Sequence, residues 1–472
     1  MHDAVVIGSG PNGLAAGITL AKAGRAVKII EAKNTIGGGM RSSELTIPGF
    51  KHDVCSSIYP FGKESLFFSQ IPSKEIGLEW IRPTNSLAHP FDDGTASFLT
   101  ESISRSAQSL NEDEKNYIRL MESVLNDWEI LKDELLGPLK ISSHPFSQAR
   151  FGLKAVFSAD FFTRKHFKGI KAKSLFAGLA GHSFLSLNEL LSSSIGLVLG
   201  LMAHRSGWLI PKGGAQNIAD KLGDYFLSLG GEIELEHSVN KFSDIPESKL
   251  VFFDITPKQI LNILGEKIPP FYRKRLENYK YGSSVFKLDW ALNSPVPFKS
   301  DECRKAGTIH VGGKYGEIFE SEYLVRKGEV SEKPFIILTQ PSLFDKTRTP
   351  ENKHTAWAYC HVPANCEIDL TERIENQIER FAPGFKDTII AKNKIFPKDL
   401  EKYNSNYIGG DINGGLMNWK QFFTRPVISF SPYNLPLKGY YICSSSTPPG
   451  GGVHGMCGYN AAKKALKQQF GL

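Results

Sequence analysis

The sequence predicts an α/β fold in which one parallel sheet is assembled from three separate segments, with an α+β domain inserted between them. Three observations lead to this prediction. Residues 4–31 run in the order strand, glycine-rich turn, small-residue helix and strand, which is typical of a βαβ unit. Two later segments, 207–256 and 439–470, return to a glycine-rich turn followed by a helix. The stretches between them differ, being mainly helical over 76–204 and rich in strands over 266–425.

The first segment has the arrangement that holds the diphosphate of a dinucleotide. A strand over 4–7 precedes a GxGxxG turn, and a helix is expected over 14–23. Glycine at the three fixed positions permits a tight turn, a close approach of the backbone to the pyrophosphate, and close packing of helix on strand. The N–H groups at the start of the helix then face the phosphates. The residues expected to bind the cofactor here are Gly8, Gly10, Asn12 and Gly13.

The second strand, over 26–30, ends at Glu31, eighteen residues after Gly13. A ribose-binding acid is expected ~20 residues beyond the turn, where its carboxylate accepts hydrogen bonds from the 2′-hydroxyl group. The same carboxylate would repel a 2′-phosphate, so Glu31 argues against NADP. The alternative is a glycine turn that only joins a strand to a helix.

A second glycine-rich loop, over 36–42, favours FAD over NAD as the dinucleotide. Backbone amides at Gly38 and Gly39 can approach the same diphosphate, and the Arg41 guanidinium can pair with it. An NAD-dependent dehydrogenase normally continues with another helix at this point. A plain surface loop is the alternative.

The second segment is expected to extend the same sheet. Apolar residues repeat with helical spacing over 215–229, and two glycines end that helix. Alternation over 233–239 predicts a strand that would place Val239 beside the adenine. The apolar run 249–256 predicts a further strand.

The third segment brings a glycine-rich loop to the other end of the cofactor. A strand over 439–443 leads into this loop, and a helix follows it. The backbone N–H groups of Gly451, Gly452 and Val453 are expected to face the pyrimidine end of a flavin ring, where they favour the anionic flavin. A C-terminal turn and helix without function is the alternative.

A chain of 472 residues is too long for one ordinary core and indicates two domains. The predicted FAD-binding domain comprises 1–75, 205–265 and 426–472, and the predicted substrate domain comprises 76–204 and 266–425.

Both insertions carry clear local patterns. One long amphipathic helix is predicted over 117–131, and strands at 284–292, 335–338 and 355–362 would form a mixed sheet over the open face of the flavin. The apolar stretch 175–203 is interrupted by polar residues, whereas a membrane span needs ~20 mostly apolar residues. It is expected to be a buried helix in the wall of an apolar pocket.

Charge and cysteine content narrow the function further. The net charge of +7 is modest and the basic residues are scattered, which does not indicate nucleic-acid binding. A basic cluster over 164–173, mixed with phenylalanines, is compatible with peripheral contact with an anionic membrane, although a solvated helix face is favoured. None of the six cysteines forms a CxxC pair, which excludes a dithiol mechanism, and their spacing fits no zinc site.

The cysteines are typical of free thiols in a reducing compartment. The first strand begins within four residues of Met1, so no leader peptide is expected. We therefore expect a cytoplasmic protein, with membrane association left open.

With these three segments, the chain resembles the phytoene-desaturase-related FAD oxidoreductases. Within them it is most similar to the branch of pyridine nucleotide-disulfide oxidoreductase domain-containing protein 2. The resemblance covers nearly the whole chain, and its most specific part is Ser446-Thr447-Pro448-Pro449-Gly450-Gly451-Gly452-Val453-His454-Gly455-Met456. Further matching stretches are 207–214, 287–292, 307–313, 358–363, 381–385 and 409–411. The resemblance implies FAD in a glutathione-reductase-like Rossmann fold split by a substrate domain, as in amine oxidases and phytoene desaturases. The "disulfide" label does not carry over without a dithiol, and the resemblance supplies no substrate.

The mechanism expected from these features is hydride transfer from a substrate carbon to flavin N5, followed by electron transfer to oxygen or a quinone. Only one complete GxGxxG follows a strand, so NAD(P)H is not an obvious partner. The candidate catalytic residues are His454, His361 and His310, each of which has a structural role as its alternative. Asp289 is expected to make a structural hydrogen bond, and Arg205 to hold phosphate or backbone.

Three functions remain open from the sequence. The first is dehydrogenation or desaturation of an apolar, lipid- or isoprenoid-like substrate, which the apolar stretch and the many phenylalanines suit. The second is a flavin amine oxidase, whose covalent-flavin subtype is weakened because Cys443 and Cys457 lie outside the C-terminal loop. The third is a flavin-binding interaction protein with little turnover. The oligomeric state is left open.

Overall fold

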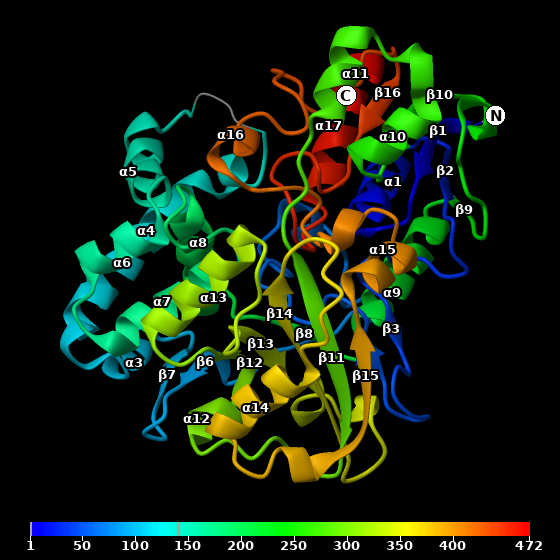
Figure 1. The fold of residues 1–472 in the computed structure, drawn as a ribbon. Helices are drawn as coiled ribbons and strands as arrows, with labels where there is room; N and C mark the ends of the chain where they lie inside the picture. The colour runs from blue at the N-terminus through cyan, green and yellow to red at the C-terminus, as the bar shows by residue number, and fades with distance from the viewer. Residues whose placement is uncertain (1, 139–141) are drawn as a thin grey trace.

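The computed structural model describes residues 2–138 and 142–472. Two main sheets organise this part of the chain (Figure 1). The blue N-terminal segment and the red C-terminal helix lie side by side at one end, and the green and yellow strands of the middle of the chain form the other end. The two chain ends therefore build one part of the molecule together.

The first sheet has five parallel strands in the order β16-β10-β1-β2-β9. All three glycine-rich segments contribute to it. The strands are β1 (His2–Ile7), β2 (Val27–Ile30), β9 (Glu232–Glu234), β10 (Ser248–Phe253) and β16 (Tyr440–Ile442).

Both faces of this sheet are covered, which explains why the central strands β1 and β10 end in four consecutive hydrophobic residues each. Successive side chains of a strand point to opposite faces. Ala4 and Val6 therefore share a core with α1 (Pro11–Lys22), α9 (Ala215–Ser228) and α17 (Met456–Phe470). Val5 and Ile7 share another core with α10 (Pro257–Leu264) and α11 (Pro270–Glu277). Gly458 lets α17 approach α1 so closely that an added Cβ would overlap the carbonyl oxygen of Asn12.

The second sheet has seven strands in the order β15-β11-β14-β13-β12-β6-β7. Neighbouring strands are antiparallel except β12 and β6, which are parallel. The strands are β6 (Asn85–Pro90), β7 (Ala96–Leu99), β11 (Ser284–Leu292), β12 (Ala306–Val311), β13 (Ile336–Thr339), β14 (His354–Val362) and β15 (Ile389–Ile395). Residues 76–204 thus supply two strands to the sheet that residues 266–425 mainly build.

Helices cover both faces of the second sheet as well. Ile374 and Ile378 of α14 (Thr371–Phe381) pack in one core with Leu288 and Leu338. Ile337 points the other way, toward α7 (Ile170–Gly181), α8 (Ser192–Arg205) and α13 (Tyr315–Lys327). The other α-helices are α2 (Leu66–Ser69), α3 (Ile103–Gln108), α4 (Glu114–Leu135), α5 (Pro145–Ala155), α6 (Ala159–His166), α12 (Asp301–Arg304), α15 (Pro397–Tyr403) and α16 (Trp419–Phe422). Two short pairs, β3 (Ser42–Ser43) with β4 (His52–Asp53) and β5 (Trp80–Ile81) with β8 (Ile210–Pro211), complete the strands.

Three local expectations need correction. The first helix begins at Pro11 rather than at residue 14, because Gly10 is its N-cap and proline suits the first helical turn. The apolar stretch 175–203 forms two helices, α7 and α8, because polar side chains bind the backbone between them. Ser183 Oγ accepts from the N–H of Leu185 at 3.2 Å, and a Glu189 carboxylate oxygen accepts from Ser186 N at 3.1 Å.

The strand expected over 233–239 ends at Glu234. The chain then turns at Glu236, whose φ is +55°, and the N–H of His237 bonds to the carbonyl oxygen of Glu31 at 3.0 Å. Val239 therefore lies in a loop rather than in a strand. In the described ranges, no helix combines the length and the apolar character that a membrane crossing requires.

Candidate functional site

A cavity of about 440 Å³ lies where the carboxyl ends of the parallel strands meet the second sheet. Ligands of open α/β sheets bind at this edge. The cavity runs from Gly8 and Glu31 in the first sheet to Thr308 and Trp357 in the second. Every cofactor-binding residue expected from the sequence lines it, apart from Gly13.

The first two glycine loops pack against each other at one end of the cavity. An added Cβ at Gly38 would lie 2.9 Å from the Cα of Gly10, and one at Gly13 would overlap the carbonyl oxygen of Gly8. Gly8 has a φ of +99°, which favours glycine. The loops therefore form a shallow backbone cradle at the start of α1. Asn12, in the first turn of this helix, has a buried side-chain oxygen without a hydrogen-bond partner.

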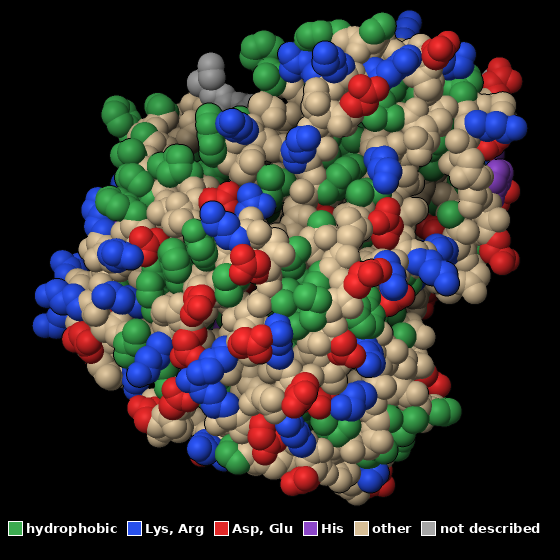
Figure 2. Space-filling model, viewed as in Figure 1, with side chains coloured by type: hydrophobic (Ala, Val, Ile, Leu, Met, Phe, Trp, Pro, Cys, Tyr) green, Lys and Arg blue, Asp and Glu red, His purple; other side chains and the backbone are tan. Residues whose placement is uncertain are grey.

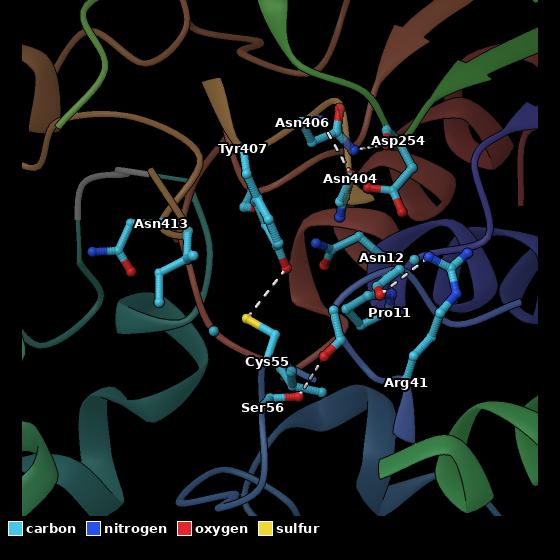
Figure 3. A pocket seen from close by; sticks show the side chains of 18 of the residues that line it. Pro11, Asn12, Arg41, Cys55, Ser56, Asp254, Asn404, Asn406, Tyr407 and Asn413 are labelled. Carbon is cyan, nitrogen blue, oxygen red and sulfur yellow. Dashed lines mark hydrogen bonds between the residues drawn. The ribbon is translucent and has the colours of Figure 1, made fainter. Parts of the chain in front are cut away.

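Glu31 and Arg41 both line the cavity beside this cradle, but they bind each other. The Arg41 Nη2 atom lies 3.2 Å from Glu31 Oε1, and it also donates to the carbonyl oxygen of Thr35 at 2.6 Å. Glu31 accepts hydrogen bonds from the N–H groups of Ser9 and Lys33, both at 3.0 Å. Arg41 thus holds the backbone of the second glycine loop, as Figure 3 shows from the side of the cavity.

Asp254 is a site residue that the sequence reasoning missed. It follows β10, and its Oδ2 accepts a hydrogen bond from the N–H of Gly13 at 2.8 Å, so it caps α1 from a distant part of the chain. The Asn406 side chain donates to the carbonyl oxygen of Asp254 at 3.1 Å (Figure 3). Burial raises the pKa of the Asp254 carboxyl well above its usual value, which favours a neutral group beside the cradle. The sequence offered one clue to this residue: Asp254 is the only acid in the apolar run 249–256, near its end.

The C-terminal loop lines the same cavity as the N-terminal turn. Gly451, Gly452 and Val453 form part of its wall. An added Cβ at Gly451 would lie 2.8 Å from the carbonyl oxygen of Asn413, so the loop packs closely against the segment before α16. Backbone from both ends of the chain therefore converges on one space.

Tyr407 and Cys55 also line the cavity and were missed by the sequence reasoning. The Tyr407 hydroxyl donates to Cys55 Sγ at 3.5 Å (Figure 3). A Cβ at Gly39 would lie 2.5 Å from the same hydroxyl, so glycine makes room for this ring. Burial raises the pKa of the Cys55 thiol, which keeps it protonated and unreactive near neutral pH.

None of the three candidate catalytic histidines lines the cavity. His454 turns inward, where its Nδ1 accepts the N–H of Met456 at 3.0 Å and its ring packs edge-on against Phe61. Burial lowers the pKa of His454 to about 4, so the ring is neutral and supports the first turn of α17. His361 Nδ1 lies 2.8 Å from a carboxylate oxygen of Glu322.

His310 lies one layer behind the cavity wall, with its Nε2 2.9 Å from Nε2 of His182. His182 itself lines the cavity, although the sequence did not single it out. Asp289 is buried and paired with Lys287, in agreement with a structural role. Arg205 forms ion pairs with Glu64 and Glu129 and does not line the cavity.

The end of the cavity away from the glycine loops is called the far chamber here. Its apolar walls come from Ile195 and Leu199 of α8, and from Trp208, Ile337, Trp357 and Tyr359. Part of the apolar stretch 175–203 thus does line a pocket. The polar side chains of the far chamber include His182, Thr308 and Thr339.

Comparisons with known proteins agree with this architecture. A model of the NAD(P)-binding Rossmann-like domain matches residues 6–67. Pyridine nucleotide-disulfide oxidoreductase domain-containing protein 2 of Rattus norvegicus is 24% identical, with 98% of this chain and 92% of the relative covered. A lycopene-forming phytoene desaturase of Pseudescherichia vulneris is 23% identical, with 99% of each chain covered.

Among solved structures, a variant of putrescine oxidase with redesigned cofactor binding has a TM-score of 0.64 and 16% identity, with 99% of each chain covered. The predicted fold class is thereby confirmed, and so is the predicted enzyme class, because the relatives are oxidoreductases. The chain is an oxidoreductase with the Rossmann-type fold of FAD-binding amine oxidases and desaturases, and along its whole length it resembles the phytoene-desaturase-related enzymes.

Proposed function

We propose that the protein binds FAD in this cavity and oxidises an apolar substrate in the far chamber. The observation that carries the proposal is one continuous space whose lining includes Gly8, Gly10 and Asn12 of the N-terminal turn as well as Gly451 and Gly452 of the C-terminal loop. A dinucleotide with an extended ring system needs such a length of backbone contact.

The residues present fit FAD on chemical grounds. A Cβ at Gly10 would meet the Asp254 carboxyl, so this position of the cradle requires glycine, and glycine also lets a diphosphate approach the backbone. The unpartnered Asn12 side-chain oxygen is an acceptor at the helix start, which suits a hydroxyl group of the cofactor. The Glu31 carboxylate suits a ribose hydroxyl. The raised pKa of Asp254 favours its neutral form, so that Asp254 does not repel the phosphates. When bound, FAD supplies a two-electron acceptor for a hydride from a substrate carbon, with oxygen or a quinone as the final acceptor.

The residues of the chain would orient the substrate and exclude water. Ile195, Leu199 and Ile337 give the far chamber apolar walls, which favour a lipid- or isoprenoid-like molecule. His454 is neutral and turned away, so no role in proton transfer is assigned to it. This arrangement suits hydride abstraction, for which alignment matters more than a strong base.

An amine oxidase is the second candidate, and one observation favours it. The rings of Trp357 and Tyr359 lie nearly parallel in the cavity wall, with centroids 5.8 Å apart, and aromatic faces attract cations. However, the only carboxylates among the described residues that line the cavity are Glu31 and Asp254, at the opposite end. The far chamber therefore offers a substrate ammonium group no acidic partner.

Anaerobic reduction of the purified flavoprotein separates these functions. We expect polyenes or acyl lipids to bleach the flavin, and amines such as putrescine to leave it oxidised. Bleaching by an amine alone would support the second candidate instead. A flavin that stays oxidised with every donor, together with a stable protein partner, would support the interaction protein. Protein purified with excess FAD that retains no flavin would refute the whole proposal.

We also propose peripheral contact with an anionic membrane, from which an apolar substrate would be drawn. On the face seen in Figure 2, hydrophobic side chains gather over α5, and Lys and Arg side chains over α6. Phe146 and Leu153 of α5 are 89% and 64% exposed, and the exposed Lys165 of α6 lies 5.7 Å from the ring of Phe161. Apolar side chains beside basic ones suit the interface of an anionic bilayer.

Co-sedimentation with vesicles tests this contact. We expect binding to phosphatidylserine-containing vesicles that weakens with salt, and little binding to phosphatidylcholine alone. The double variant Phe146→Ser/Leu153→Ser should bind less at unchanged fold. Equal behaviour of wild type and variant would refute the assignment of this surface.

A further inference from the structure

We propose that His182 and Thr308 form an oxygen-binding subsite in the far chamber, which recognises one hydroxyl or carbonyl group on an otherwise apolar substrate. The inference rests on the proposed function and deepens it by naming the polar group of the substrate. It is carried by a histidine pair in the cavity wall and by an unpartnered hydroxyl beside it.

The two histidines are held in a defined arrangement. His182 follows α7, is half-buried and lines the cavity, whereas His310 on β12 is fully buried behind it. Their Nε2 atoms lie 2.9 Å apart, which is hydrogen-bond distance. The ring of Trp208 packs edge-on against His182, with centroids 5.7 Å apart. On the other side, an added Cβ at Gly178 would lie 2.5 Å from Nδ1 of His310, so glycine admits that ring.

This arrangement defines what His182 presents to the cavity. Burial lowers the pKa of both histidines, that of His182 to about 3, so both rings are neutral at physiological pH. His310 Nδ1 is buried and has no partner. An orphaned buried N–H is rare in proteins, so the His310 proton belongs on Nε2, which donates to His182. His182 then accepts at Nε2 and must carry its own proton on Nδ1, as a free donor.

Thr308 supplies the second polar group. Thr308 and His310 are two residues apart on β12, so their side chains share one face of the sheet. The Thr308 hydroxyl is buried, lines the cavity and has no hydrogen-bond partner. Buried polar atoms are almost always paired, so an unpaired hydroxyl on a residue of the cavity wall calls for a partner. A substrate oxygen is the partner that satisfies both an N–H donor and a hydroxyl.

The chemistry of the subsite favours a neutral oxygen over an ammonium group. An N–H donor repels an ammonium group, which has only donors of its own. No carboxylate lines this end of the cavity in the described part of the chain. The surrounding Ile195, Leu199 and Ile337 leave the rest of the substrate in an apolar environment.

The test compares ligands that differ in one oxygen atom. Geraniol, farnesol and retinol are each titrated beside the hydrocarbon of the same skeleton and the matching primary amine, with holoprotein and a Trp-fluorescence or calorimetric readout. We expect at least one alcohol to bind about tenfold or more tightly than its hydrocarbon and its amine, as one or two hydrogen bonds predict. A panel in which no alcohol is preferred, or in which an amine is preferred, overturns the inference.

Four variants assign the preference to these residues. Thr308→Val and His182→Phe should each weaken alcohol binding about tenfold and leave hydrocarbon binding unchanged, whereas His182→Gln, which keeps a donor, should retain part of the preference. Thr339→Val is the matched control, because Thr339 lines the same chamber but already donates to the Gly307 carbonyl oxygen at 2.7 Å. Gly178→Ala should displace His310 and weaken alcohol binding without altering the cavity surface, and alanine suits a helix better than glycine.

Flavin content is measured in every variant. Loss of flavin from the wild type refutes the proposed function. Retained flavin with an alcohol preference that survives both Thr308→Val and His182→Phe refutes only the subsite. The two failures are therefore distinguishable.

Discussion

Replacement of Gly10 by alanine tests the cradle with one methyl group. The new Cβ would lie 2.5 Å from Oδ2 of Asp254, whereas ordinary contact begins at 3.4 Å. The carboxyl would have to withdraw by roughly 1 Å, although it is buried and accepts the N–H of Gly13 at 2.8 Å. Overpacking costs about 1–3 kcal/mol, and a strained or broken buried hydrogen bond costs about 1 kcal/mol more.

We therefore expect Gly10→Ala to lower the free energy of unfolding by about 2–4 kcal/mol and to weaken FAD binding at least tenfold. Urea titration of the apoprotein measures the first quantity, and titration with FAD followed by visible absorbance measures the second. Gly316→Ala is the control, because Gly316 has no atom within 4 Å of an added Cβ and lies in α13. That variant should retain wild-type flavin affinity.

A double-mutant cycle identifies the cause. Asp254→Ala removes the group that the new methyl meets, so the Gly10→Ala/Asp254→Ala double variant should lose less stability than the sum of the single variants, by about 0.5–3 kcal/mol. Strict additivity, or wild-type flavin affinity in Gly10→Ala, would refute the reasoning about the cradle.

Three other predictions follow from the described contacts. Gly458→Ala should lower the free energy of unfolding by more than about 2 kcal/mol, because the new Cβ would overlap the Asn12 carbonyl oxygen. Chemical denaturation measures this loss, and visible absorbance should show reduced flavin retention. Near-wild-type stability would contradict the reasoning. Arg348→Met should lower the free energy of unfolding, measured with urea, by about 3–5 kcal/mol. The Arg348 guanidinium lies 3.0 Å from Asp53 and 2.8 Å from Asp345, and the substitution leaves these two buried carboxylates without a cation. An unchanged free energy of unfolding would show that both acids are protonated. The pKa of His204, buried between the Tyr117 hydroxyl and the Thr100 carbonyl oxygen, is lowered from 6.5 to about 4, so the unfolded chain binds a proton there at a higher pH than the folded protein. The contribution of neutral His204 to the free energy of unfolding is fully present above pH 6.5, and about 3 kcal/mol of it is lost as the pH falls toward 4. His204→Gln should therefore flatten the pH dependence of the free energy of unfolding between pH 6.5 and 4. An unchanged slope would refute this assignment.

Local pattern was enough for the elements that lie near each other in sequence. The turn from Gly8 to Gly13, the buried strand over 284–292 and the long helix around 117–131 each follow from hydrophobic period and glycine placement within a short window. The strand expected over 233–239 failed because tertiary contacts decided where it ended: the backbone of His237 bonds to that of Glu31, far away in sequence.

The site shows the same division. Its backbone cradle could be predicted, because glycine is the residue that permits close approach and it is visible in the sequence. Its side chains could not, because each acts through a distant partner. Asp254 meets Gly13 across 241 residues, Cys55 meets Tyr407 across 352, and His182 meets His310 across 128. The sequence predicted His454 at the flavin because its loop was expected to run along the ring, but the hydrogen bond from the N–H of Met456 holds the histidine ring away from the cavity.

The sequence by itself determined that this chain builds a dinucleotide-type sheet from three glycine-rich segments, because strand, turn and helix propensities act over a few residues. Only the tertiary structure decided which side chains face the cavity. A pocket lining is a property of packed surfaces, and the packing of α7 against β12 encloses His310 while His182 and Thr308 line the cavity. Those choices depend on contacts between residues that no local window contains.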